Sequence, residues 1–148
     1  MRCEELMLND WVRLTKVVLY CKVAGITPSG HIVGRTAGGG GFEQKAENLS
    51  PVELTYDTIL CTSFWQKRKG VYKKAVRGVA TFVYEQESRR LTVTSLATGC
   101  VNTHYISFLH ELQQLYRHYT GLELEINLNC NKRKEYSRQY YEKKKEAV

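Results

Sequence analysis

The stretch FLHELQQLYRHYTGLEL, from Phe108 to Leu124, changes its hydrophobic period in the middle. In its first part, apolar residues recur mostly every third residue, which is typical of one face of a helix. The apolar set is Ile106, Leu109, Leu112, Leu115, Tyr116 and Tyr119. The other face carries His110, Glu111, Gln113, Gln114, Arg117 and His118. We therefore predict a helix over residues 105–120 that packs on a sheet with its apolar face and leaves its polar face in water.

Gly121 stands where this helix should end, because glycine adopts the left-handed cap conformation without a Cβ penalty. After it, apolar and polar residues alternate, which is the period of a strand. The apolar positions are Leu122, Leu124, Ile126 and Leu128. We expect this strand to return to the sheet beneath the helix.

The preceding residues predict the sheet itself. A short helix is expected from Tyr56 to Thr62 with Thr55 as N-cap, although Thr58 is not the Glu or Gln that completes a capping box. Apolar residues then alternate in three runs, the last two joined by a polar loop. The expected strands are Val71–Ala75, Val79–Tyr84 and Leu91–Ser95.

The N-terminal part reads as short strands separated by turns. Its apolar runs are Trp11–Val12, Val17–Tyr20, Val23–Ile26 and His31–Val33. Strands this short usually curl into a small barrel or a tight meander, and an SH3-like barrel is one form of the first. We expect an α+β protein with an N-terminal barrel or meander at 1–53, an antiparallel sheet packed by one amphipathic helix at 54–128, and a basic tail at 129–148.

Composition favours a cytoplasmic protein. Five cysteines stand far apart among 148 residues and form no CxxC pair, which argues against a disulfide framework or a zinc ribbon. The first residues lack the apolar core of a secretory signal, and Val17–Cys21 is too short to cross a bilayer, so no membrane association is expected. The formal net charge of +7 is concentrated in residues 67–77 and in the tail.

Four segments resemble a family of small uncharacterised proteins from gut anaerobes and from their phages and mobile elements. The segments are LHELQQLYRHYTGLELEI, EELMLNDWV, LSPVELTYDTILCTSFW and SLATGCVNTHYISFLHELQ, which together span about residues 4–128. The first is similar to the family's C-terminal signature, a His-x-Leu-Gln-x-Leu-Tyr helix followed by Thr-Gly and a strand. This chain departs from the family at Tyr56, Asp57 and Thr58, where acidic residues are usual, and in its glycine tract and basic tail. The resemblance implies a fold and a genomic setting, and it brings no catalytic residues.

Catalytic and metal-binding motifs are incomplete. His110-Glu111 begins a zincin-like HExxH, but position 114 is Gln, so the second ligand is missing. The chain has no GxSxG and no cysteine beside a recognisable base. We expect a protein that is not an enzyme and that needs no metal or cofactor.

A glycine tract invites comparison with phosphate-binding loops. It consists of Gly38, Gly39, Gly40 and Gly41. A P-loop requires Lys-Ser/Thr after its glycines, and here Phe42 and Glu43 follow. A flexible hairpin loop is the favoured interpretation, and a loop that contacts an anionic ligand is the alternative.

Nucleic-acid binding has better support. The segment WQKRKGVYKKAVR interleaves aromatic rings for bases with cations for phosphates. The candidate residues are Trp65, Lys67, Arg68, Lys69, Tyr72, Lys73, Lys74 and Arg77, with Lys132, Arg133 and Lys134 of the tail. If residues 71–76 form a strand, Tyr72 and Lys74 share one face and Lys73 shares the other with Ala75. The alternative is a solvated basic hairpin with Trp65 buried.

Two classes of function remain. The first is a non-enzymatic accessory protein of a phage or mobile element that binds nucleic acid through its basic segments. The second is a factor that binds another protein or sequesters a small anionic ligand such as a nucleotide, for example against host defence.

Overall fold

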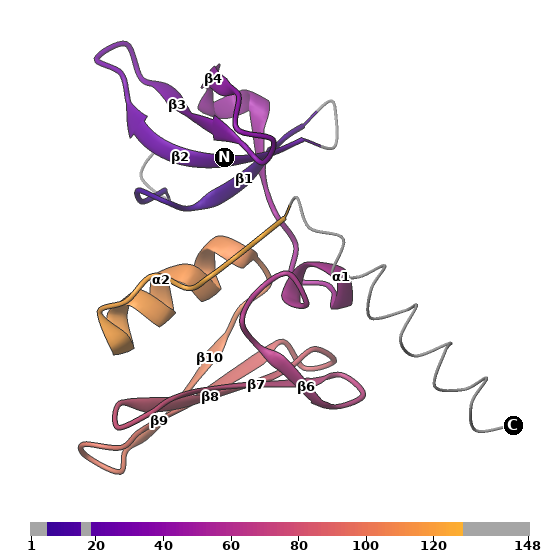
Figure 1. Ribbon diagram of the computed structural model, residues 1–148, viewed down its shortest axis with the longest axis vertical. Coiled ribbons are helices and arrows are strands. Elements are labelled where there is room, and N and C mark those ends of the chain that lie inside the picture. Colours follow the sequence, from indigo (N-terminus) through magenta and orange to yellow (C-terminus); the bar gives the residue numbers. More distant parts are fainter. Residues whose placement is uncertain (1–5, 16–18, 129–148) are drawn as a thin grey trace, which may run out of the picture.

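The computed structural model describes residues 6–15 and 19–128. They form two antiparallel five-stranded sheets, and one long helix lies between them (Figure 1). This arrangement agrees with the α+β class. Neither of the described α-helices is long and apolar enough to cross a membrane.

The first sheet is strongly curled. Its strands are β1 (Trp11–Leu14), β2 (Tyr20–Ile26), β3 (His31–Thr36), β4 (Gly41–Lys45) and β5 (Leu49–Pro51). They lie in the order β4-β3-β2-β1-β5, so β4 and β5 occupy opposite edges. Only a three-residue 3-10 helix, η2 (Ala46–Asn48), joins these two strands. Such a link reaches at most about 14 Å, whereas the edges of a flat five-stranded sheet lie about 19 Å apart. The sheet must therefore curl to bring β4 and β5 within reach of this link.

The curl does not close the sheet. Among the described residues β4 pairs only with β3, and β5 pairs only with β1. The predicted N-terminal barrel is therefore not confirmed as a closed barrel. Part of the predicted strand Val17–Tyr20 lies outside the described residues.

Gly34 in β3 permits the bend between β2 and β3. A Cβ atom at this position would overlap the carbonyl oxygen of Lys22 and lie 2.7 Å from the Phe42 ring. The register between β2 and β3 shifts at Val23 and Gly25, as in a β-bulge. Close backbone approach at a glycine and a bulge both increase local twist, which explains why this sheet curls.

The second sheet is a meander. Its strands are β6 (Trp65–Arg68), β7 (Val71–Val76), β8 (Ala80–Glu85), β9 (Arg90–Ser95) and β10 (Val101–Tyr105), in the order β10-β9-β8-β7-β6. The three predicted strands correspond to β7, β8 and β9. Edge strands β6 and β10 were not predicted, because almost all of their side chains are exposed and they show no buried alternation.

Helix α1 (Tyr56–Ile59) is shorter than predicted and better capped. The Thr55 hydroxyl accepts a hydrogen bond from the Thr58 N–H at 3.3 Å, and the Thr58 hydroxyl accepts one from the Thr55 N–H at 2.8 Å. Thr58 thus completes the capping box that was expected to lack its second member, because a hydroxyl at this position can reach back as Glu or Gln does.

Helix α2 (Leu109–Thr120) begins four residues later than predicted. The backbone before it is extended, since the Ile106 N–H donates to the Arg89 carbonyl. Glu111 accepts hydrogen bonds from the Ser107 and Phe108 N–H groups, both at 3.1 Å, and so caps the helix start. Gly121 ends the helix in the left-handed conformation with φ of 70°, as predicted.

The segment after α2 does not form the predicted strand. Its only ladder contact among the described residues is an isolated bridge between Thr62 and Ile126, so it runs beside the end of α1 and does not return to the second sheet. Leu124 is buried, but Leu122 is 54% exposed. The alternation reflects packing, since Ile126 and Leu128 also pack against the core, but the backbone of this segment bonds to Cys61 and Ser63 and not to a strand of the second sheet.

The apolar side of α2 packs on the second sheet. Leu109 and Leu112 are fully buried there, in one cluster with Phe82 of β8. The same cluster includes Trp11 of the first sheet. Trp11 therefore joins the first sheet to the hydrophobic cluster around α2. The first sheet also has a separate hydrophobic cluster of its own, formed by Leu6, Val12, Cys21, Val23, Ile32 and Leu49.

Part of the side of α2 that was predicted to face water is covered by the first sheet. Gln113 is only 1% exposed, and its amide oxygen accepts from the Trp11 N–H at 2.9 Å while its amide nitrogen donates to the Asn9 carbonyl at 2.8 Å. Strand β5 pairs with β1 only from Val12 onward, so the Trp11 N–H lies beyond that ladder and needs another acceptor. The prediction failed because a polar residue on a helix can also form hydrogen bonds with a buried backbone group, as Gln113 does with Trp11.

An ion pair extends the same contact. Arg117 Nη1 lies 2.9 Å from Asp10 Oδ1, and the Asp10 side chain has no exposed area. The other carboxylate oxygen of Asp10 accepts from the Met7 N–H and from the Gln114 amide, both at 2.9 Å. Helix α2 is thus tied to the first sheet by polar groups and to the second by apolar ones.

The free energy of unfolding should fall in alkali, because three tyrosines of the protein are buried. Burial raises the pKa of the Tyr72, Tyr84 and Tyr116 phenols above their usual value of about 10. The unfolded chain therefore releases these protons at a lower pH than the folded chain. The contribution of the three phenols to the free energy of unfolding is fully present below about pH 10 and is lost as the pH rises through their pKa values in the folded chain.

Urea titrations between pH 8 and 11 measure this effect as a fall in the free energy of unfolding above about pH 10. Tyr84→Phe should flatten that fall, because it removes one of the titrating phenols. A free energy that stays constant across the interval would contradict the prediction.

Candidate nucleic-acid interface

The second sheet has one covered face and one open face. Side chains that alternate with the core positions point away from α2, and we call them the outer face. The strand register places Trp65, Arg68, Val71, Lys73, Ala75, Thr81, Val83, Glu85, Arg90, Thr92, Thr94, Val101, Thr103 and Tyr105 there, and of these Val71 is buried. None of these residues belongs to either hydrophobic cluster. No described helix or strand covers this face (Figure 1).

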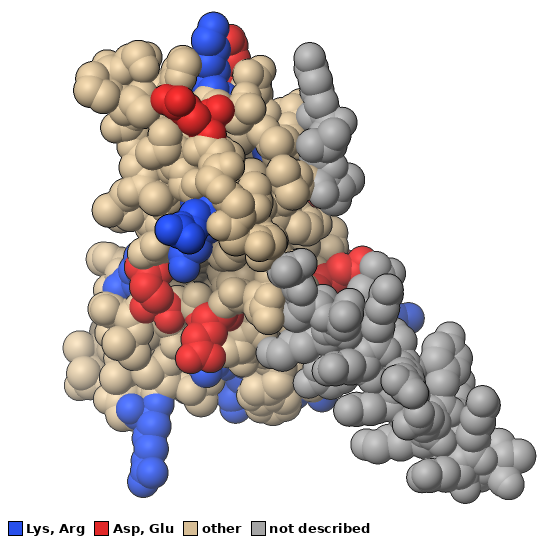
Figure 2. All heavy atoms as spheres, turned by 45° about the horizontal axis from the view of Figure 1, so that its top comes forward, with Lys and Arg blue, Asp and Glu red and all other residues tan. Residues whose placement is uncertain are grey.

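Positive charge is concentrated on this sheet. Residues 65–105 hold eight Lys or Arg against two Glu, a net charge of +6. The remaining described residues hold five Lys or Arg against eight Asp or Glu, a net charge of −3. Figure 2 shows Lys and Arg side chains along the lower margin of the molecule, where the second sheet lies.

The predicted cations occupy different parts of the sheet. Lys67, Arg68 and Lys69 are exposed beside the β6–β7 turn. Lys73 lies near the middle of the outer face, and Arg77 is exposed in the β7–β8 turn at the other end of β7. In the part of the chain that the structure describes, no ion pair joins any of these five to an acidic side chain.

Two predicted residues lie on the covered side of the sheet. Lys74 is paired with Phe82, so it shares the core face with Tyr72, as the strand pattern predicted. Tyr72 is 1% exposed, and its hydroxyl donates to the Gln86 amide oxygen at 3.3 Å. Its predicted contact with bases is therefore wrong, because the ring is part of the core.

Trp65 is available for such a contact. It is 49% exposed on the outer face, directly opposite Lys73 on the neighbouring strand. The alternative in which Trp65 is buried is therefore wrong. The chain alternates at this point, so the preceding residue, Phe64, takes the core position.

Sequence reasoning missed Tyr105. This ring is 72% exposed at the end of β10, on the outer face. It pairs with Arg90, which forms an ion pair with Glu85 on the same face. The signal that could have predicted this strand is the alternation of β-prone residues from Val101 to Tyr105. Because a glycine-containing turn comes directly before it, the segment was interpreted as part of the loop that leads into the helix.

The predicted glycine tract does not join this face. Gly38, Gly39, Gly40 and Gly41 close the hairpin between β3 and β4, and the Gly39 and Gly40 N–H groups donate to Thr36. Those two donors are thus already used, which supports the hairpin interpretation over an anion-binding loop. Lys132, Arg133 and Lys134 lie outside the described residues.

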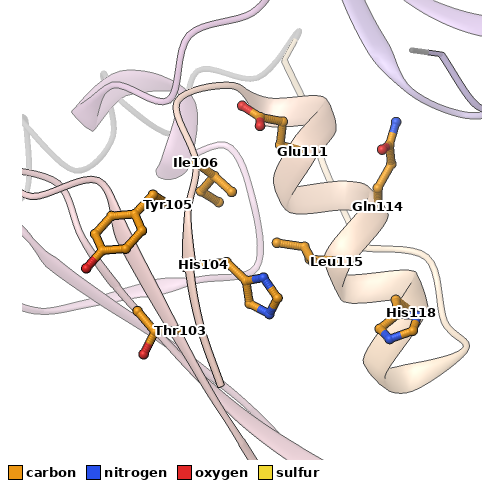
Figure 3. A pocket seen from close by; sticks show the side chains of 8 residues that line it. All are labelled: Thr103, His104, Tyr105, Ile106, Glu111, Gln114, Leu115 and His118. Atoms are coloured by element: carbon orange, nitrogen blue, oxygen red, sulfur yellow. The ribbon is translucent and has the colours of Figure 1, made fainter. Parts of the chain in front are cut away.

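A cleft lies between the edge strand β10 and helix α2. Figure 3 shows His104 pointing toward Leu115 and His118, whereas Tyr105 points away from α2. His104 Nε2 lies 2.7 Å from the Tyr119 hydroxyl, and Glu111 caps the helix. His104 and Glu111 therefore already have hydrogen-bond partners within the protein. The cleft is a groove lined by both polar and apolar side chains, and it lies beside the free edge of β10.

Comparison of the chain with protein-family models, with curated proteins and with solved structures gave no match. Within residues 6–15 and 19–128, no three His, Cys, Asp or Glu side chains are grouped as a metal site requires.

Proposed function

We propose that this protein is a non-enzymatic nucleic-acid-binding protein that uses the second sheet as its interface. The observation that carries the proposal is the segregation of charge, +6 on residues 65–105 against −3 on the rest of the described chain. Phosphate backbones are attracted by such a concentration of Lys and Arg without any need for sequence recognition. The family resemblance adds that the protein serves a phage or another mobile element.

The arrangement of the cations supports the same function. Lys67, Arg68 and Lys69 project beside one turn, while Lys73 and Arg77 continue the charge along β7. Since these cations have no acidic partners among the described residues, their charge is available to phosphates. Each phosphate contact releases condensed counterions and so makes affinity depend on salt.

Neutralising the cations at the β6–β7 turn tests the proposal. The triple variant K67Q/R68Q/K69Q should weaken binding of a mixed-sequence single-stranded oligonucleotide. Loss of three phosphate contacts lowers the slope of log affinity against log salt by about 2. Fluorescence anisotropy between about 50 and 200 mM salt measures this slope.

The matched control is K22Q/R35Q/K45Q, which removes three exposed cations from the first sheet. Both triple variants lower the formal net charge from +7 to +4, so they separate location from total charge. The control should keep the wild-type slope. Absence of binding at about 50 mM salt, or an equal effect of both variants, would refute the proposal.

A protein-interaction role is the second candidate. Strand β10 is a free edge of the second sheet, and a partner strand can add to such an edge. The cleft between β10 and α2 lies beside this edge and would receive alternate side chains of the added strand. This candidate takes precedence if no oligonucleotide binds at low salt.

We also propose that the first sheet is an open SH3-like barrel. Five short strands, the strong curl and the one-turn connection between the two edge strands support this arrangement. It serves as the support that holds α2 against the second sheet.

A further inference from the structure

We infer that the outer face binds an unpaired nucleic-acid strand, with bases stacked on Trp65 and Tyr105. The inference rests on the proposed nucleic-acid function and specifies its substrate class. Both rings belong to edge strands, Trp65 to β6 and Tyr105 to β10. They are 49% and 72% exposed, so a large part of each side chain is open to solvent.

The surface between the two rings consists of two neighbouring rows of side chains. The row that crosses the sheet from Trp65 continues through Lys73, Val83, Thr92 and Thr103. Tyr105 lies two residues beyond Thr103 on β10, in the row that contains Arg90 and Glu85. Threonine hydroxyls both donate and accept hydrogen bonds, and Lys73 supplies a positive charge beside the Trp65 ring. The row is therefore suited to sugars, phosphates and base edges.

The size of the face also fits a short strand. Four interstrand spacings separate β6 from β10, which corresponds to about 19 Å. At roughly 3.4 Å per stacked nucleotide, about six nucleotides cover this distance. Lys67, Arg68 and Lys69 at one end, with Arg77 at the other, extend the charge along the sheet beyond this row.

An unpaired strand suits this surface better than a duplex. Bases in a duplex are stacked on each other, and their faces cannot reach an aromatic side chain on a protein surface. A duplex would gain only the phosphate contacts, whereas a single strand would gain those and two stacking contacts.

The test uses the full chain and a single strand of about 12 nucleotides, as DNA and as RNA, with a duplex of the same length. The chain has two tryptophans, and Trp11 is 8% exposed. A strand that stacks on Trp65 should therefore quench only the emission of the exposed indole. The single strand should also bind more tightly than the duplex.

The variant W65A/Y105A removes two stacking contacts and should lose at least about 30-fold in affinity for the single strand, with an unchanged salt slope and little change for the duplex. Leu122→Ala, which removes an exposed apolar side chain away from this face, should bind as the wild type does. Both DNA and RNA strands should respond, and the tighter one identifies the natural sugar.

Equal binding of duplex and single strand, with W65A/Y105A behaving like wild type, overturns this inference and leaves the proposed function intact. No binding of any oligonucleotide at low salt overturns both. A dimer in light scattering that W65A/Y105A dissociates would show that the rings bind a second copy of the chain, which also overturns the inference.

Discussion

Arg117→Met should lower the free energy of unfolding by about 3–5 kcal/mol, because it leaves a buried carboxylate without its cation. Asp10 has no exposed side-chain area, and Arg117 is its ion-pair partner at 2.9 Å. The loss also removes the contact of Arg117 with Glu123 beyond the helix end. Urea denaturation followed by circular dichroism measures the change.

Two controls make the result specific. Arg90→Met removes an ion pair with Glu85 whose side chains are 42% and 33% exposed, so its effect should be far smaller. In the Arg117→Met background, Asp10→Asn should recover part of the loss, because it removes the charge left unpaired. If the effects of the two substitutions simply add, the pair is not coupled and this account of α2 is wrong.

Gln113→Ala should destabilise the protein by about 2–4 kcal/mol, an effect expected of a core residue and not of a helical surface glutamine. The substitution opens a cavity and leaves the buried Trp11 N–H without its acceptor. The neighbouring Leu112→Ala should cost about 2–5 kcal/mol on the other side of the helix.

His118→Ala is the matched control, because His118 is the exposed position of α2. Its effect should stay within about 0.5 kcal/mol. A similarly small effect of Gln113→Ala would mean that α2 is covered by one sheet only. The same urea titrations, followed by Trp11 fluorescence in a Trp65→Phe background, give all three values.

Local patterns predicted the elements that have one buried face. The alternation in β8 and β9 and the apolar stripe of α2 reflect contact with a single core, and a sequence shows such periodicity directly. Gly121 was also predicted correctly, because the left-handed conformation at the end of a helix is a local requirement that glycine meets.

The errors concern residues whose environment depends on distant segments. Gln113 looks like a solvent-facing position, and only the packing of β1 against α2 makes it a partner of the Trp11 backbone. Exposed edge strands such as β10 lack any core-facing signal, so Tyr105 was missed. Among the candidate site residues, the sequence showed where the cations are concentrated, and only the strand register decided that Trp65 faces outward and Tyr72 inward.

The unequal charge of the two halves has a kinetic consequence. With positive charge on the second sheet and negative charge on the remaining described residues, the described part of the molecule carries an electric dipole. A polyanion at a distance would rotate the protein before the first encounter, so that the basic sheet arrives foremost and the acidic side is turned away. At physiological ionic strength this torque acts only within a screening length of about 8 Å, so orientation is corrected in the last step of approach.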